Sequence, residues 1–286
     1  TAPDQVQRLR PLLDVGKLRL MATLYAAGIK WLDDPSNRDA RFDRVRVRRL
    51  LAAPPLPGLE RQRLAETAER LGRAVEALDL LADQVVRAAV VPLDVNGLWT
   101  GAVRLSLAPW GAAPLETRLR VLRRVLRAVG GEPYPPRQER LERLAEALLT
   151  SGFRGATLAG CVVIPHTGAV TVARESARTA AGTALPGAGW VVWDGRFRVR
   201  RPAGAPDSLR VAPLGPPPAS EHRGDDPWIQ LQRAGLPRAV VETLPAFWSD
   251  QAVWAVSWLN DGDAAAAVAP LPHGLFSAAP YGQWRG

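Results

Sequence analysis

Hydrophobic positions recur at helical spacing through the first half of the chain. Val15, Leu18 and Met21 fall on one face of a helix expected over about residues 15–27, and Gly28 follows where a left-handed C-cap is favoured. A second helix is expected from about Asn37 to Ala52, where a proline-rich stretch ends it. These two helices are expected to form the first structural region.

Residues 54–150 show the helical period most clearly. From about Leu59 to Val90, apolar residues such as Leu64, Leu71 and Leu78 form one stripe opposite arginines and glutamates. Two further helices are expected over about 115–129 and 136–149. We therefore expect this middle section to be all-helical.

The period changes to two after residue 150. Two strands are expected over 157–164 and 169–174, and Asp194-Gly195 predicts a hairpin turn between strands 190–193 and 196–200. Residues 202–227 are rich in proline and glycine and resemble a loop. A short helix near 237–244 and a strand near 252–259 complete a small β-rich region.

Composition adds a basic charge that is unevenly distributed. The formal net charge is +9, residues 1–50 and 151–210 each carry +5, and residues 211–286 carry −3. Such blocks suit a phosphate backbone, although 35 of the 37 basic residues are arginine, as in proteins encoded by GC-rich genes. The sequence thus leaves open whether the charge serves binding or reflects composition.

Several kinds of function are excluded or disfavoured. Cys161 is the only cysteine, which excludes an intrachain disulfide and a thiolate metal cluster, and it lies in an apolar strand typical of a core. The three histidines have no ligand spacing, so no metal site is expected. No run of 18 apolar residues occurs, and we expect a cytoplasmic protein without a membrane partner.

One ordered set of motifs near the start is the most informative feature. Arg10-Pro11-Leu12-Leu13 is followed by Asp34-Pro35-Ser36-Asn37 and then by an arginine-rich helix with Phe42 near its start. In that helix Arg41, Arg44 and Arg48 are expected on one face, where guanidinium groups could bind phosphate bidentately. The alternative is that these arginines only pair with Asp39 and Asp43.

These motifs resemble the end of the catalytic domain in tRNA(Ile)-lysidine synthetases. Later segments resemble the alphaproteobacterial branch of that family: Tyr134-Pro135-Pro136-Arg137, Thr157 to Cys161, Arg174-Glu175 and Trp193 to Phe197. Where many members have Asn after the first arginine of the helix, this chain has Val45. The S-G-G-x-D-S motif by which the family binds ATP does not occur in residues 1–286.

The resemblance implies a fold, a reaction and partners. The fold is α+β: residues 1–53 as the tail of an α/β PP-loop catalytic domain, 54–150 as a helical tRNA-binding domain and 151–286 as a β-rich C-terminal domain. The family is an ATP-dependent ligase that adenylates the wobble cytidine of tRNA(Ile), after which lysine displaces AMP to give lysidine. ATP, with Mg as its counter-ion, and lysine would be bound by a preceding segment, so this chain alone is expected to be inactive.

The resemblance also suggests binding residues. Nucleotide or tRNA phosphates are expected at Arg41, Arg44, Arg46 and Arg48, beside the motif turn Asp34, Pro35, Ser36 and Asn37. Further tRNA contacts are expected at Arg10, Arg196, Arg198 and Arg200. Catalytic residues and the oligomeric state are not predicted.

Two other functions remain open. The first is a non-catalytic RNA- or tRNA-binding protein derived from the same family, which the absent ATP motif favours. The second is an accessory region of another PP-loop enzyme, such as a tRNA thiolase, which the lack of cysteine pairs disfavours. An S-G-G-x-D-S reading frame upstream would separate a ligase from a standalone binder.

Overall fold

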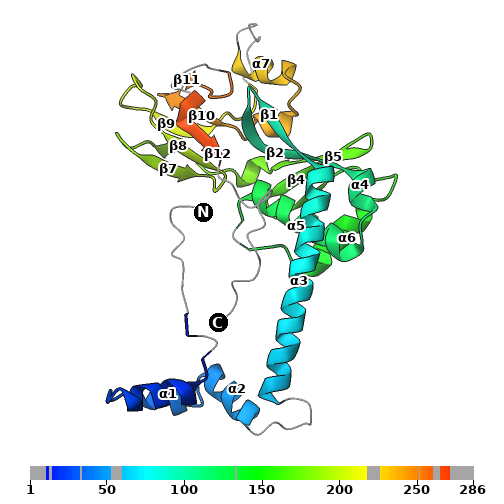
Figure 1. Cartoon of the computed structure of the whole chain (residues 1–286). Helices are drawn as coiled ribbons and strands as arrows, with labels where there is room; N and C mark the ends of the chain where they lie inside the picture. Colours follow the sequence, from blue (N-terminus) through cyan, green and yellow to red (C-terminus); the bar gives the residue numbers. More distant parts are fainter. Residues whose placement is uncertain are drawn as a thin grey trace. The chain divides into compact units, whose positions relative to one another are not determined.

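The computed structural model describes residues 11–12, 15–32, 34–52, 60–132, 134–217, 226–250, 252–259 and 265–270. It mixes helices with antiparallel sheets, as the expected α+β class requires (Figure 1). The described residues fall into two compact units, unit 2 up to Ala77 and unit 1 from Leu78 onwards. The division lies within one helix, α3 (Arg61–Ala89), and not at residue 53 or 150.

Unit 2 contains short helices. These are α1 (Lys17–Ala26), the 3-10 helix η1 (Pro35–Arg38), α2 (Asp43–Ala52) and the first part of α3. The helix expected from Asn37 to Ala52 is wrong at its start, because α2 begins only at Asp43. The backbone N–H of Arg41 donates to the Asp39 carboxylate and not into a helix, so the chain turns between η1 and α2.

The apolar stripe of α3 is buried differently from the expectation. Leu64 and Leu71 are exposed. The residues of α3 that are buried all lie in its second part, within unit 1: Asp79 and three apolar residues on the same face, Ala82, Val86 and Ala89. Asp79 is held by an ion-pair network with α5 (Leu115–Gly130): its Oδ1 lies 2.9 Å from Arg120 Nη1 and 3.0 Å from Arg124 Nη2.

A five-stranded antiparallel sheet forms the centre of unit 1. Its order is β1-β2-β5-β4-β3, with β1 (Val90–Val95), β2 (Leu98–Ser106), β5 (Ala169–Arg174), β4 (Cys161–His166) and β3 (Ala156–Leu158). Asn96 and Gly97 both have positive φ and connect β1 to β2, as a tight hairpin turn requires.

Two expectations are therefore wrong. Residues 54–150 are not all-helical, because β1 and β2 lie among them and β2 pairs with β5, a strand from beyond residue 150. The strand expected over 157–164 is two strands, since Ala159 and Gly160 turn the chain with positive φ between β3 and β4. Between β3 and β4, the two-residue Ala-Gly turn divides a stretch whose apolar residues suggest a single strand.

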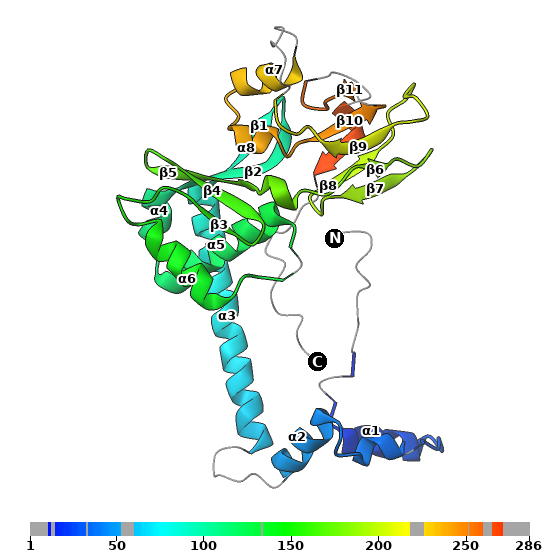
Figure 2. The ribbon, with the colours of Figure 1, turned by 180° about the vertical axis from the view of Figure 1, so that it is seen from behind.

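Helices cover one face of this sheet (Figures 1 and 2). The helices are the end of α3, α4 (Leu107–Gly111), α5 and α6 (Gln138–Ala147), and they share a core with Val103, Leu105 and Val172. The end of α5 approaches the β3–β4 turn so closely that a Cβ on Gly130 would lie 2.2 Å from the Ala159 carbonyl oxygen. Only glycine fits there.

The opposite face of the sheet carries a second core. Ala102 and Ala173, which point away from the helices, pack with the C-terminal elements. Those are η2 (Ser176–Arg178), β6 (Thr183–Ala184), β7 (Trp190–Trp193), β8 (Phe197–Arg200), β9 (Arg210–Pro213), α7 (Pro227–Arg233), α8 (Arg238–Val241), β10 (Pro245–Ser249), β11 (Ala252–Ala255), η3 (Ala265–Ala267) and β12 (Val268–Pro270).

The C-terminal strands form two small sheets, β11-β10-β9-β6 and β12-β8-β7. Strand β9 lies inside the stretch 202–227 that resembled a loop, which is a further correction, whereas the expected hairpin at Asp194-Gly195 is confirmed as β7–β8. Asn96 Nδ2 donates to the Trp258 carbonyl at 2.8 Å, and Trp258 Nε1 donates to the Leu98 carbonyl at 3.1 Å. The C-terminal strands are thus tied to the β1–β2 turn.

Among the described residues, no helix has the length and apolar content needed to cross a bilayer. In the same part of the chain, His, Cys, Asp and Glu side chains form no group of three that could hold a metal ion.

The core position of Cys161 gives a first prediction. Its side chain is fully buried and burial raises the pKa of the thiol to about 12, so almost no thiolate exists at pH 8. We expect a thiol reagent such as DTNB to leave the native protein unmodified at pH 8 for minutes and to titrate one thiol after denaturation. Rapid native reaction would show that the sheet is open at β4.

Candidate RNA-binding surfaces

The Asp34–Asn37 turn of unit 2 is organised by its own side chains. Asp34 caps η1 by accepting a hydrogen bond from the Ser36 N–H at 2.8 Å, and Pro35 occupies the first position of that helix. This backbone hydrogen bond is the largest cause that lowers the pKa of Asp34, followed by the Ser36 side chain. Both Asp34 and Asn37 are exposed. The four motif residues therefore form a helix-entry turn.

Two of the four predicted phosphate-binding arginines already have carboxylate partners. Arg41 Nη2 lies 2.7 Å from Asp39 Oδ2, and the hydrogen bonds from Arg41 lower the pKa of Asp39. Arg46 pairs with Asp43 one turn earlier on α2. The expected shared face of Arg41, Arg44 and Arg48 is wrong, because Arg41 precedes the helix.

Arg44 and Arg48 are the two arginines of this set that remain available. They are one helical turn apart on α2, both are exposed, and within the described ranges neither forms an ion pair. The Arg44 guanidinium lies 5.4 Å from the centre of the Phe42 ring. Val45 is buried in unit 2. Arg10 lies outside the described residues.

The β7–β8 hairpin of unit 1 carries the second set of predicted contacts. Its inner face buries Trp193, Phe197 and Val199, as the alternation predicts. Arg198 and Arg200 lie on the outer face, and both guanidinium groups stack on Trp190, 5.3 Å and 5.2 Å from its ring centre.

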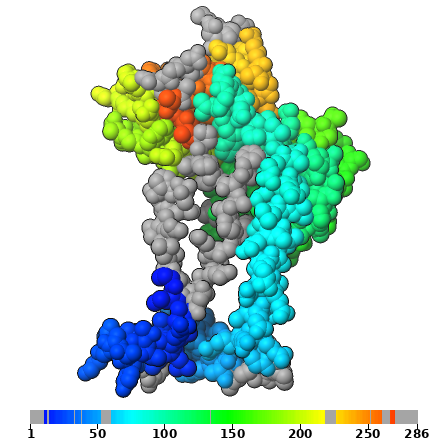
Figure 3. Space-filling view, in the orientation of Figure 1, coloured from blue at the N-terminus to red at the C-terminus, as the bar shows by residue number. Residues whose placement is uncertain are grey.

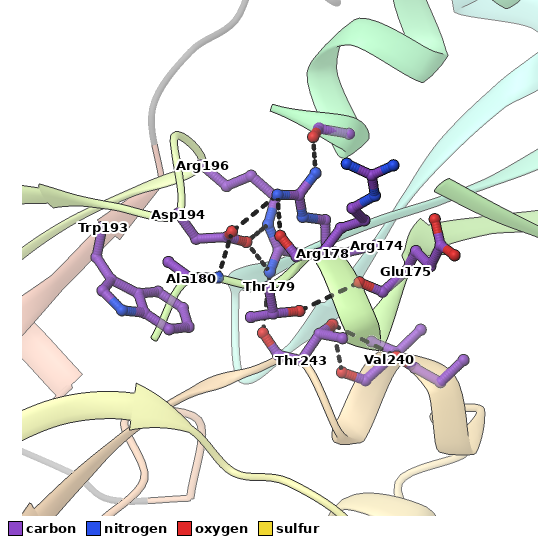
Figure 4. A network of polar contacts seen from close by, with 12 residues as sticks. Arg174, Glu175, Arg178, Thr179, Ala180, Trp193, Asp194, Arg196, Val240 and Thr243 are labelled. Atoms are coloured by element: carbon purple, nitrogen blue, oxygen red, sulfur yellow. Dashed lines mark hydrogen bonds and ion pairs between the residues drawn. The ribbon is translucent and has the colours of Figure 1, made fainter. Parts of the chain in front are cut away.

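Arg196 is not a surface contact, which corrects its prediction. Its side chain is completely buried, since the Asp194-Gly195 turn directs it beneath the hairpin. Its Nε donates to Asp194 Oδ2 at 2.7 Å and its Nη2 donates to the Thr243 carbonyl at 2.9 Å (Figure 4). Gly101, with a φ of 79°, leaves the space, since a Cβ there would lie 2.7 Å from Arg196 Nη1.

Asp194 joins Arg196 to the central sheet. Its Oδ1 lies 3.0 Å from Nη2 of Arg174, the last residue of β5, and also accepts the Ala180 N–H at 2.9 Å (Figure 4). Arg174 in turn donates to the carbonyls of Gly130 and Arg178. Burial lowers the pKa of Arg196 to about 10, against the opposing effect of Asp194, so the Arg196 guanidinium group stays charged at neutral pH.

Trp190 and Asp194 are the residues whose roles sequence reasoning missed. Asp194 is predicted only as a turn residue, and Trp190 only as the first residue of the strand expected over 190–193. The turn of Asp194, Gly195 and Arg196 fixes the register that places Trp190 opposite Arg200, so the stacked pair follows from the hairpin. The buried contact with Arg174 depends on tertiary packing and leaves no local signal.

Comparison with known proteins is consistent with this geometry. A family model described as a PP-loop domain matches residues 2–54, and one described as the TilS substrate binding domain matches residues 105–194. A tRNA(Ile)-lysidine synthase of Ruegeria pomeroyi is 33% identical over 246 residues, 86% of this chain and 54% of that protein. The chain is related to the tRNA(Ile)-lysidine synthases.

Other alphaproteobacterial lysidine synthases agree. The protein named tRNA(Ile)-lysidine synthase from Methylobacterium nodulans is 38% identical over 178 residues, which is 60% of this chain and 51% of that protein. The one from Methylobacterium sp. is 42% identical over 140 residues, 49% of this chain and 39% of that protein. The resemblance to the family is thereby confirmed, and the chain spans about half the length of the curated relatives it matches.

The buried Asp194 contact gives the second prediction. Asp194→Ala leaves Arg174 and Arg196 buried without their carboxylate, which in comparable sites costs about 3–5 kcal/mol of stability. We expect the melting temperature to fall by roughly 10 °C, as measured by circular dichroism.

Asp207→Ala is the matched control for that change. It removes a fully exposed carboxylate that pairs with Arg201, and such surface pairs contribute at most about 1 kcal/mol. Equal effects of the two substitutions would show that Asp194 does not have the role assigned to it.

Proposed function

We propose that this chain is the tRNA-recognising portion of a lysidine-forming ligase, which attaches lysine to the wobble cytidine of tRNA(Ile) with ATP. The observation that carries the proposal is the 33% identity to the Ruegeria protein, which extends over 86% of the chain. The match to a substrate-binding family model within unit 1 supports tRNA binding by that unit. Such a protein acts in the cytoplasm.

The exposed apolar surface of unit 2 supports a larger assembly. Helix α1 buries none of its residues, and Leu18 and Leu32 are 82% and 98% exposed. Apolar side chains at such density are usually covered by another protein surface. We propose that the body of a PP-loop catalytic domain packs here.

ATP and lysine belong to that catalytic body in this proposal. Residues 1–286 contain no S-G-G-x-D-S sequence, so we assign them no ATP or Mg site of their own and expect no lysidine formation by this chain alone. When bound, ATP activates the cytidine by adenylation. Arg44 and Arg48 contribute from the edge of the site, where their exposed guanidinium groups hydrogen bond to phosphate oxygens of the nucleotide or the tRNA.

The lack of an S-G-G-x-D-S sequence in residues 1–286 favours one alternative, a non-catalytic RNA-binding protein derived from the ligases. Both functions require RNA binding, but only the ligase requires Arg44 for a chemical step. The two experiments below therefore test binding and catalysis separately.

The third prediction concerns tRNA binding by the chain as it stands. Residues 1–50 and 151–210 each carry a net charge of +5, which suits contact with about 4–6 phosphates. We expect the logarithm of the binding constant for a tRNA(Ile) transcript to fall with the logarithm of salt concentration, with a slope near −3 to −5. A binding constant that does not change with salt concentration, or no binding at about 50 mM KCl, would contradict tRNA recognition.

The fourth prediction concerns Arg44 in a ligase that carries both the PP-loop segment and this chain. Arg44→Ala should reduce kcat/KM for lysidine formation at least tenfold, because about 1.4 kcal/mol of lost transition-state binding is a factor of ten. The melting temperature should stay unchanged, since an exposed arginine contributes at most about 1 kcal/mol to stability.

Arg46→Ala provides the control on the same helix, because Arg46 is already paired with Asp43. We expect this variant to keep wild-type kinetics. Wild-type kinetics for Arg44→Ala as well would leave α2 with a purely structural role.

A further inference from the structure

The outer face of the β7–β8 hairpin presents an aromatic ring between cationic groups. This surface, here called the Trp190 face, consists of Trp190 and Val192 on β7 and Arg198 and Arg200 on β8. Trp190 is 39% exposed and Val192 is 52% exposed. In Figure 3 the yellow-green stretch that includes this hairpin lies at the surface of unit 1. The face is therefore open to a ligand.

Stacking prepares the two arginines for binding. Each guanidinium lies within 5.3 Å of the Trp190 ring centre, which limits the rotamers available to a long side chain. Among the described residues, no carboxylate pairs with Arg198 or Arg200, whereas the neighbouring Arg196 and Arg201 both have such partners. Their charge is thus uncompensated within the described chain.

A pocket adjoins the Trp190 face at Arg200. Its volume is about 450 Å³, and small residues, including Gly187, Gly204 and Ala205, form much of its wall. Arg201 also lines it, but its Nη2 already contacts the Ala205 carbonyl and Asp207. Of the two arginines that line the pocket, Arg200 is therefore the one that a ligand can reach. It lines the pocket and also lies over the Trp190 ring.

We propose that the Trp190 face binds an unpaired nucleotide segment of an RNA. An unpaired base exposes its planar face, which stacks on indole or guanidinium planes, while a neighbouring phosphate accepts hydrogen bonds from Arg200 at the pocket. A double helix hides its base faces and offers only phosphates, so it would leave Trp190 and Val192 unused. This inference deepens the proposed function, because tRNA carries unpaired loops and an unpaired end.

The fifth prediction tests the site with simple probes and the full chain. Fluorescence anisotropy compares a labelled octauridylate with a blunt RNA duplex of twelve base pairs, at one salt concentration. We expect wild-type protein to bind the octauridylate more tightly. The double variant R198A/R200A and the single variant W190A should each weaken octauridylate binding at least tenfold, with melting temperatures that show a retained fold.

Two further variants separate stacking from charge. R63A/R73A removes two exposed arginines of α3, each of which pairs with a nearby glutamate, and it should change octauridylate affinity less than about twofold. R198K/R200K keeps the charge but loses the planar stacked group, so it should bind more weakly than wild type. It also provides a folded test if the alanine variants are unstable.

Three results would overturn the proposal: duplex binding as tight as octauridylate binding, unchanged octauridylate affinity in R198A/R200A, or an equal loss in R63A/R73A. The proposed function is judged on a different probe, the tRNA(Ile) transcript. Loss of octauridylate selectivity with intact tRNA binding would reject this site alone, whereas absent tRNA binding would reject the proposed function.

Discussion

A single buried carboxylate holds the C-terminal region of unit 1 together. Asp194 accepts from Arg174 of the central sheet and from Arg196 of the hairpin, and Arg196 extends the connection to the Thr243 carbonyl before β10 (Figure 4). Both buried guanidinium groups depend on this one carboxylate, and removing one partner of such a buried ion pair is strongly destabilising. The outer face of the hairpin therefore owes its fixed position to the residue at the turn beneath it.

Patterns that repeat within one element were predictable from sequence. Helix α5, the β7–β8 hairpin and the core position of Cys161 followed from periodicity and turn chemistry, because these signals are local. The β1–β2 hairpin was missed although Asn96-Gly97 has the preferred turn sequence. Because a long helical pattern comes directly before this hairpin, the whole section is predicted as helical, and the turn signal of Asn96-Gly97 is not used.

The candidate sites were predictable only in part, for the same reason. Sequence alternation placed Arg196 with Arg198 and Arg200, and only the tertiary structure shows that the turn bends Arg196 inwards to Asp194. Likewise, helical spacing grouped Arg41 with Arg44. The backbone N–H of Arg41 instead donates a hydrogen bond to the Asp39 carboxylate, so Arg41 lies before the start of α2. Short polar side chains that hydrogen bond to backbone groups determine where such a helix begins. Whether such a hydrogen bond forms depends on local geometry.

The sheet with a core on each face has a consequence for how the chain reaches its fold. Neighbouring residues of β2 pack into different cores: Val103 into the core under the helices, and Ala102 into the core with the C-terminal elements. The strand β5, which pairs with β2, is more than sixty residues away in sequence. Neither core can close before this distant pairing forms, which makes folding depend on non-local contacts and slows it. Helices and strands that look like successive modules therefore act as one cooperative unit, and no chain break between β2 and β5 would separate two independently folding pieces.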